Sequence, residues 1–275
     1  MNSLKPRLLT AAVGIPVALV IMILTELWHP LVGIIVGLAN GMMVTEYLNA
    51  KRLTNCLPLT VACVAFSVMT PILIATPFWY IIAVLYLLGA FGVLVYLHQK
   101  LTFSSFTYAV CGSMLITFGM SAIPLAANNN ASSSFFFVLI FLLPWMADGG
   151  GYFIGSKFGN RKLCPKISPK KTVEGALGGL VFCLISALLM GIIFQLIIRD
   201  YRINFFAIIL LALLDSAVSI LGDLSFSLIK RHLSIKDYGS FFPGHGGVLD
   251  RFDSIIFTAP VVIAVNVAIP FLTAV

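Results

Sequence analysis

Nine apolar segments divide this sequence, and each is close to the roughly 20 residues that a helix needs to cross a bilayer. They cover approximately residues 8–28, 30–48, 57–76, 78–98, 106–126, 134–154, 173–198, 204–229 and 254–274. Only 10% of the 275 residues are charged, whereas soluble proteins carry about 25%. The pattern predicts an all-α integral membrane protein, a polytopic bundle of about nine transmembrane helices.

The basic residues predict the orientation of this bundle. With the N-terminus in the cytoplasm, only Arg199 and Arg202 of the 17 basic residues fall on the outer side. Positively charged loops stay in the cytoplasm, so we expect an N-in, C-out topology. The net charge of +7 thus marks topology, and no nucleic-acid partner is expected. The polar loops 155–172 and 230–253 would share the cytoplasmic face.

The domain organisation follows from the same pattern. Lys5 and Arg7 precede an apolar run that is longer than the core of a signal peptide, so we expect a retained first helix. No polar stretch is long enough to form a separate soluble domain. We therefore expect one membrane domain over 1–275, in which 1–130 forms the N-terminal helices and 134–275 forms the catalytic helices and cytoplasmic loops.

The eighth apolar segment carries a polar stripe. Its residues are spaced by four, four, four and three positions, which places them on one helical face: Asp215, Ser219, Asp223, Ser227 and Lys230. Carboxylates on a buried face are tolerated when they bind a cation, pair with a base or stay protonated. A packing seam between helices is the alternative, and for Asp215 a structural or protonated role weighs equally.

A glycine-rich turn follows, from Phe242 to Gly247, and leads into the last apolar segment. Its glycines let the backbone approach a ligand, and the amides at the start of the next helix favour an anion. Asp250 and Asp253 in that first turn suit a divalent cation. The alternative is a turn with ordinary acidic residues at a helix start, in which His245 is simply a hydrogen-bonded loop residue.

The loop after the sixth segment is also unusual. Asp148 lies inside an apolar run and is followed by three glycines, which weaken a helix. We expect Ser168 to cap the seventh helix with Pro169 at its first position. Lys170 and Lys171 would then lie at a helix N-terminus, where cations oppose the macrodipole. Phosphate binding explains that placement, and a positively charged topology anchor is the alternative.

Five glycines flank this loop at helical spacing, and we expect them to allow close helix packing rather than chemistry: Gly151, Gly155, Gly159, Gly175 and Gly179. Taken together, the polar residues favour a metal-assisted phosphate site at the cytoplasmic membrane surface. Magnesium prefers oxygen ligands and substrate phosphates, and lysines and arginines neutralise phosphate groups.

The chain resembles the phosphatidate cytidylyltransferase family, also called CDP-diacylglycerol synthases. The resemblance is carried by a signature of polar residues and glycines: Ser227, Lys230, Arg231, Lys236, Asp237, Pro243, His245, Gly246, Gly247, Asp250, Arg251 and Asp253. The Leu221-Gly222-Asp223, Ala147-Asp148-x-Gly and Ser168-Pro169-Lys170-Lys171-Thr172 elements are also similar to the family. The N-terminal half resembles it only in hydrophobic character.

The resemblance implies transfer of CMP from CTP to phosphatidic acid, with pyrophosphate released. It implies catalytic roles for Asp223, Asp250, Lys230, Arg251 and His245, and a magnesium site at Asp223, Asp250 and Asp148. Substrate binding is expected at Ser168, Lys170, Lys171, Thr172, Arg231, Lys236, Asp237, Gly246 and Gly247. A second cation, monovalent or divalent, and a homodimer are left open. A multi-pass protein of the bacterial inner membrane is implied, surrounded by membrane lipids, with its active site toward the cytoplasm.

Two other functions fit parts of the sequence. A CTP-dependent lipid kinase of the polyprenol or phytol type shares the Ser-Pro-Lys-Lys-Thr element, but it is not expected to carry the whole 227–253 signature. An ion-coupled transporter could use the Asp stripe as its pathway, but it predicts matched broken helices in two halves. The sequence has no such symmetry.

Overall fold

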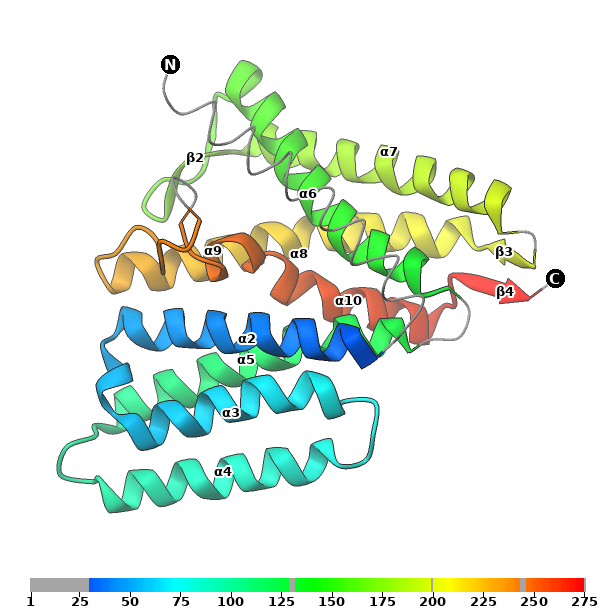
Figure 1. Ribbon diagram of the computed structural model, residues 1–275. Coiled ribbons are helices and arrows are strands. Elements are labelled where there is room, and N and C mark those ends of the chain that lie inside the picture. Colours follow the sequence, from blue (N-terminus) through cyan, green and yellow to red (C-terminus); the bar gives the residue numbers. More distant parts are fainter. Residues whose placement is uncertain (1–29, 129–131, 199, 243–245, 275) are drawn as a thin grey trace. The chain divides into compact units, whose positions relative to one another are not determined.

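The computed structural model describes residues 30–128, 132–198, 200–242 and 246–274 (Figure 1). The expected first helix over 8–28 lies outside the described residues. The chain divides into two compact units: residues 1–128 with 232–252, and residues 129–231 with 253–275. By these contacts the segment 232–252 groups with the N-terminal helices, and the domain organisation expected from the sequence stays a prediction.

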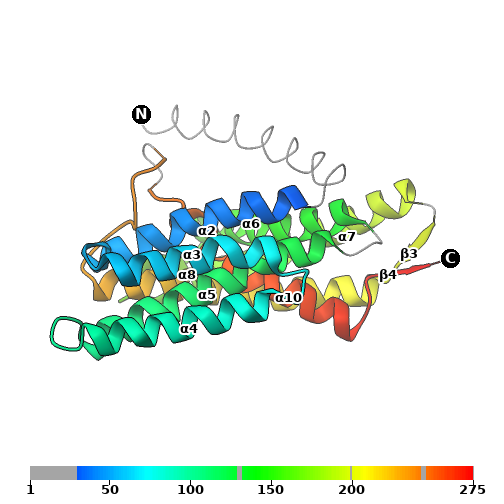
Figure 2. The same ribbon diagram turned by 60° about the horizontal axis from the view of Figure 1, so that its bottom comes forward.

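Where the structure describes it, the first unit consists of four helices and the segment 232–252. Its elements are α2 (Pro30–Ala50), the 3₁₀ turn η1 (Leu53–Asn55), α3 (Leu57–Leu73), α4 (Trp79–Tyr96), α5 (Phe103–Ala127) and the short α9 (Leu249–Phe252). Helices α2, α3 and α5 pack against one another, and α4 packs mainly along α3. Figures 1 and 2 show these four helices side by side.

Small residues bring α2 and α3 together. A Cβ atom at Gly37 would lie 2.5 Å from the carbonyl oxygen of Val68, and one at Gly33 would lie 2.8 Å from that of Pro71. Only glycine therefore fits at this crossing, as is common where membrane helices approach closely. Beside it, fully buried side chains such as Met43, Leu48 and Phe66 form the apolar core of the unit.

The second unit combines four helices with two short hairpins. Its elements are α6 (Ser133–Phe158), β1 (Lys162–Cys164), β2 (Ser168–Thr172), α7 (Val173–Ile197), β3 (Tyr201–Ile203), α8 (Phe205–His232), α10 (Ile255–Ala268) and β4 (Leu272–Ala274). β1 pairs antiparallel with β2, and β3 pairs antiparallel with β4. The closest helix pair is α6 with α7.

The glycines between α6 and α7 behave as the sequence predicts. A Cβ atom at Gly175 would lie 2.7 Å from the carbonyl oxygen of Gly151, and one at Gly179 would lie 2.4 Å from that of Ala147. Larger residues would hold the two backbones apart, so the prediction of close helix packing is confirmed. This packing holds the first turns of α7 close to α6.

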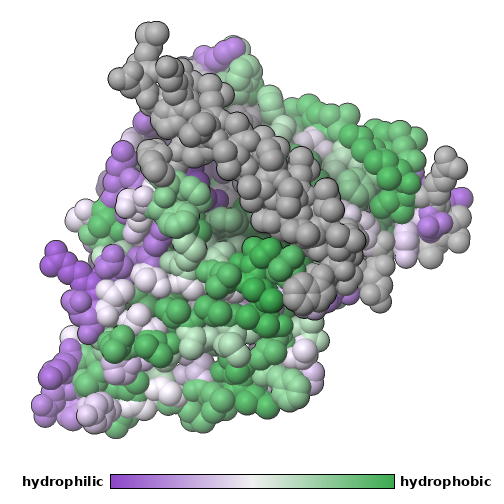
Figure 3. Space-filling model, in the orientation of Figure 1, coloured by the Kyte–Doolittle hydropathy of each residue, from purple (hydrophilic) through white to green (hydrophobic). Residues whose placement is uncertain are grey.

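Among the described residues, seven helical stretches are long and apolar enough to cross a membrane, and one of them, Leu249–Ala268, takes in both α9 and α10. Helix α3 is a shorter apolar helix of 17 residues. Figure 3 shows apolar side chains over much of the visible helix surfaces, with hydrophilic residues gathered where α2 turns into α3 and α4 turns into α5. Lys51, Arg52 and Lys100 lie in those two connections. The expectation of an all-α polytopic membrane protein is confirmed. The number of spans and their orientation stay predictions.

The last expected span, 254–274, is wrong at its C-terminal end. Helix α10 stops at Ala268, and Leu272–Ala274 forms strand β4 instead. Pro270 explains the stop, since a residue before proline is pushed toward the extended conformation, and Ile269 has φ −140° and ψ 100°. Asn266 then accepts a hydrogen bond from the Phe271 amide through Oδ1, at 3.1 Å.

Candidate active site

The polar stripe of α8 faces inward. Asp215 and Ser219 are fully buried, and Ser227 and Lys230 are each only 8% exposed. Asp223 is half-buried, and its Oδ1 accepts a hydrogen bond from Ser227 Oγ at 3.3 Å. The predicted clustering of these residues on one helical face is therefore confirmed. It places two carboxylates and a lysine on the buried side of a single helix.

The segment before α7 differs from its prediction. Ser168 does not cap that helix, because Ser168–Thr172 forms strand β2 and the helix begins only at Val173. Thr172 is the cap, and its Oγ1 accepts a hydrogen bond from the Gly175 amide at 3.1 Å. Pairing with β1 competes with an earlier helix start and satisfies the backbone groups of this segment. Lys170 and Lys171 therefore lie on a strand rather than at a helix N-terminus.

This change separates the two lysines. Successive side chains of a strand point to opposite faces. Lys170 is exposed, whereas Lys171 is half-buried and forms an ion pair with Asp223. The two lysines were predicted as a pair, but only Lys171 joins the carboxylate of the α8 stripe.

The segment just before α10 contributes Asp253, and α6 contributes Asp148, to the same neighbourhood. Asp253 Oδ1 accepts a hydrogen bond from the Ser254 amide at 2.9 Å, and Asp148 Oδ2 lies 3.5 Å from Ser254 Oγ. Asp253 is also within electrostatic range of Asp223, Lys230 and Asp148. The second unit thus gathers three carboxylates and two lysines, a set called here the acid–base cluster: Asp148, Asp223, Asp253, Lys171 and Lys230.

The acid–base cluster has the right chemistry for a hard cation, because carboxylate oxygens are the ligands that magnesium prefers. Asp215 extends it inward: its carboxylate is buried, has no hydrogen-bond partner among the described residues and interacts electrostatically with Asp148. Across the described ranges, no three His, Cys, Asp or Glu side chains are close enough to hold one ion as they stand. The donors therefore suit magnesium, but they do not form a ready-made cage.

In the first unit, Asp250 organises the segment that carries the family signature. Its Oδ2 accepts hydrogen bonds from the Tyr238 amide at 2.8 Å and the Gly247 amide at 3.0 Å. Gly246 has φ +86°, a left-handed conformation that favours glycine. Asp250 is 8% exposed, so a buried carboxylate joins the two ends of this turn.

A second carboxylate holds the next two amides. Glu46 on α2 accepts hydrogen bonds from the Val248 amide through Oε1 at 3.0 Å and from the Leu249 amide through Oε2 at 2.9 Å. The sequence predicts that the amides at this helix start favour an anion. In the structure the amides of Gly247, Val248 and Leu249 already donate to carboxylates of the protein.

Sequence reasoning missed Glu46, although one signal was available. It is the only acidic residue between Glu26 and Asp148. A charged side chain inside an apolar helix is costly and usually has a specific partner. Its partner lies about 200 positions away, and nothing in the spacing of the residues points to it.

The other predicted site residues are placed as follows. Asp237, Lys236 and Arg251 are exposed and belong to the first unit. Arg231 is exposed in the second unit, where its Nε donates to the carbonyl oxygen of Ile167 at 3.4 Å. His245 lies outside the described residues. Asp223 and Asp250 belong to different units, so their sharing of one ion stays a prediction.

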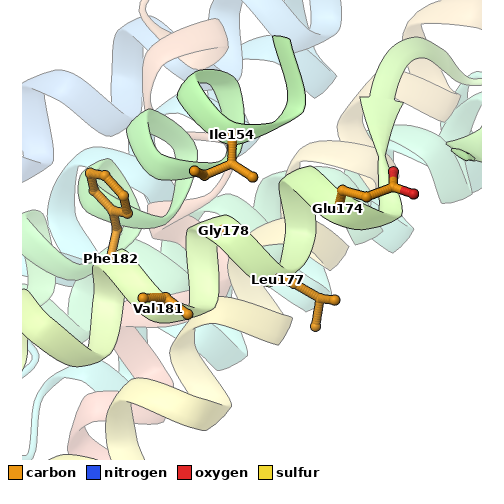
Figure 4. Close-up of a pocket in the computed structure, with 6 residues that line it drawn as sticks. All are labelled: Ile154, Glu174, Leu177, Gly178, Val181 and Phe182. Atoms are coloured by element: carbon orange, nitrogen blue, oxygen red, sulfur yellow. The ribbon is translucent and has the colours of Figure 1, made fainter. Parts of the chain in front are cut away.

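A shallow groove of about 310 Å³ runs between α6 and α7 (Figure 4). It is lined by apolar side chains, including Ile154, Leu177 and Phe182, and Glu174 lies at one end. Glu174 accepts hydrogen bonds from the backbone amides of Asn160 and Arg161. The groove has no basic lining residue, so it does not suit a triphosphate.

Fold and cluster together define a class: a polytopic helical membrane protein with an acid–base cluster suited to phosphate chemistry. Comparison with known families gives the identity within that class. The chain matches the cytidylyltransferase family over residues 5–268. The chain therefore belongs to this family, and the resemblance inferred from the signature is confirmed.

Among curated relatives, the chain is 48% identical over 116 residues to a phosphatidate cytidylyltransferase of Bacillus subtilis, which covers 42% of this chain and 41% of that protein. It is 44% identical over 120 residues to the protein of that name from Staphylococcus haemolyticus, covering 44% of each chain. For the Haemophilus influenzae protein of that name, identity is 44% over 126 residues, covering 44% of this chain and 42% of that one. The matched stretches thus span less than half of these relatives.

Proposed function

We propose that this protein transfers CMP from CTP to phosphatidic acid and forms CDP-diacylglycerol and pyrophosphate. A phosphate oxygen of the lipid attacks the α-phosphorus of CTP, and the bond between that phosphorus and the oxygen bridging to the β-phosphorus breaks. Pyrophosphate leaves with that bridging oxygen. The observation that carries the proposal is the acid–base cluster of the second unit, and the names of the relatives indicate which phosphates it handles.

The reaction needs little help from a general base, because a lipid phosphate is already ionised. Its barrier comes largely from bringing two anions together, and fixed positive charge lowers such a barrier. Lys171 and Lys230 supply that charge within the cluster. When Lys171 contacts a phosphate, its ion pair with Asp223 would be exchanged for one with the substrate.

Magnesium is proposed as the cofactor. When bound, it would supply further positive charge to offset the negative charge of the two phosphate groups. Asp223 would hold it, with Asp148 and Asp253 beside it, and Asp250 stays a predicted ligand. The neighbouring Ser227 and Ser254 would orient these carboxylates through the hydrogen bonds that they make now.

The substrate lipid is proposed to come from the surrounding bilayer, and CTP from the cytoplasm. We accordingly place the protein in a bacterial inner membrane, with the acid–base cluster toward the cytoplasmic side. Supporting this are the positively charged connections and the bacterial sources of the relatives named above.

The test uses the full chain in lipid nanodiscs that contain phosphatidic acid, with magnesium present. Two parallel reactions receive CTP labelled at either the α- or the γ-phosphorus. With α-labelled CTP we expect labelled lipid and unlabelled pyrophosphate. With γ-labelled CTP we expect unlabelled lipid and labelled pyrophosphate. Nanodiscs without phosphatidic acid are the control.

A different distribution of label would overturn the proposal. Lipid labelled only from γ-labelled CTP, with CDP released, would identify a CTP-dependent lipid kinase. No labelled lipid from either nucleotide would exclude CMP transfer to phosphatidic acid for this chain.

A further inference from the structure

Glu46 occupies an unusual place for a charged residue. It lies near the end of α2, whose other residues are uncharged, and its two oxygens accept hydrogen bonds from consecutive amides of the segment 246–250. Hydrogen bonds to an ionised group are stronger than neutral ones. The carboxylate therefore acts as a clamp with two contacts rather than as a surface charge.

Two glycines, Gly239 and Gly247, leave room for the Glu46 carboxylate. A Cβ atom at Gly239 would lie 2.3 Å from Glu46 Oε1, and one at Gly247 would lie 2.4 Å from Oε2. Glycines on both sides thus leave the space that the carboxylate fills. Such a fit is specific to this side chain and is not expected of an incidental contact.

The neighbouring residue of α2, Tyr47, contacts Tyr238, which precedes the segment 246–250 in the chain. The Tyr47 ring stacks on that of Tyr108 with centroids 4.2 Å apart, and the Tyr238 ring lies 6.0 Å from Tyr47. The Tyr238 amide in turn donates to Asp250. Glu46 therefore holds the two amides just before Asp250, and Tyr47 contacts the residue whose amide donates to Asp250.

We propose that Glu46 is a positioning residue: by holding the Val248 and Leu249 amides it sets the place of the Asp250 carboxylate. The inference rests on the proposed function, in which Asp250 is a predicted magnesium ligand. It extends that function into the N-terminal half of the chain, where the sequence signature offers no residue. Residues that orient metal ligands through hydrogen bonds commonly control metal affinity.

The first measurement is hydrogen exchange of the full chain in nanodiscs, without substrate or metal. Glu46→Gln keeps the size of the side chain but loses its charge and one acceptor. We expect amides of the peptide covering 246–252 to exchange about 10- to 100-fold faster, the range that the loss of a charged hydrogen bond implies. Amides of α3 and α5 should exchange as in the parent protein, which shows that the fold is intact.

Thr45→Val is the matched control on the same helix. The hydroxyl of Thr45 donates only within α2, to the carbonyl oxygen of Gly41 at 2.7 Å. We expect this variant to leave the exchange of 246–252 and the enzymatic activity unchanged.

The second measurement is the magnesium concentration that gives half-maximal CMP transfer. For Glu46→Gln we expect it to rise about 10- to 100-fold, as is typical when a residue that orients a metal ligand is replaced. A purely structural role would reduce the amount of active protein but would not move this midpoint.

The two proposals fail in different ways. Unchanged exchange over 246–252, or faster exchange with an unchanged magnesium midpoint in an active enzyme, would overturn the role of Glu46. A parent protein without CMP transfer would overturn the proposed function. In that case faster exchange in Glu46→Gln would still support the anchoring of the segment by Glu46.

Discussion

The carboxylates of the two units contact different kinds of groups. In the first unit, Glu46 and Asp250 accept hydrogen bonds from backbone amides of a turn that has no regular pairing. In the second unit, Asp223 instead contacts two side-chain groups, which are the ammonium of Lys171 and the hydroxyl of Ser227. Losing a carboxylate should therefore disturb chain order in the first unit and charge chemistry in the second.

The largest effect is expected at Asp223. Asp223→Asn keeps the shape but removes the charge that balances Lys171 and would hold magnesium. We expect kcat for CMP transfer to fall at least about 1,000-fold, roughly 4 kcal/mol, with little change in the exchange of backbone amides. Ser225→Ala is the control on the same helix, since its hydroxyl donates only to the Leu221 carbonyl oxygen at 2.7 Å. Near-normal turnover in Asp223→Asn would refute this assignment.

The two lysines of β2 should differ in their effect on CMP transfer. Lys171→Met should lower kcat/KM for CTP by about 10- to 1,000-fold, or roughly 1.4–4 kcal/mol, because it removes a cation from the acid–base cluster. Lys170→Met should cost less than about tenfold, because that exposed side chain points to the opposite face of the strand. Steady-state kinetics with varied CTP decide between the two. Equal losses would mean that the strand geometry does not separate them.

A substitution at Gly239 tests how tightly the chain fits around the Glu46 carboxylate. Gly239→Ala would place a methyl group 2.3 Å from Glu46 Oε1, so the carboxylate must leave its amides or the turn must move. We expect a stability loss of about 1–3 kcal/mol, with faster exchange over 246–252. Gly92→Ala is the control, because nothing lies within 4 Å of that position. Thermal unfolding in one detergent compares both variants, and equal transitions would argue against a tight fit.

The smallest effect is expected at Thr172. Thr172→Ala removes the oxygen that caps α7 and should lower stability by about 1 kcal/mol. Thermal unfolding measures the loss, and kcat per folded molecule should stay close to that of the parent. A large fall in kcat at unchanged stability would instead support the substrate-binding role that the family resemblance implies for Thr172.

Much of the fold could be predicted because the governing forces are local. Apolar segments of about 20 residues predict spanning helices regardless of their partners, and the four-residue spacing on α8 predicts a shared face. The helical spacing of the glycines in α6 and α7 likewise predicts close packing of these two helices. All three follow from periodicity alone.

The errors arise where long-range or competing contacts decide. Ser168 is a good cap, but pairing of β2 with β1 moves the helix start to Thr172, which caps equally well. The C-terminal residues are apolar enough for a helix, yet Pro270 ends it and the remainder pairs with β3. The partners of Glu46 lie in a segment about 200 positions later, and no pattern in a single sequence links them.

The division of the chain at 128, 231 and 252 also limits how this protein can be cut. A fragment ending at residue 128 would keep Glu46 but lose the segment that it holds. A fragment beginning at 129 would carry that segment without its support, and one ending at 231 would lack α10. The boundary between the N- and C-terminal halves of the sequence does not coincide with the boundary between the two units. A chimera with a relative should therefore fold only when residues 232–252 and the N-terminal helices come from the same protein.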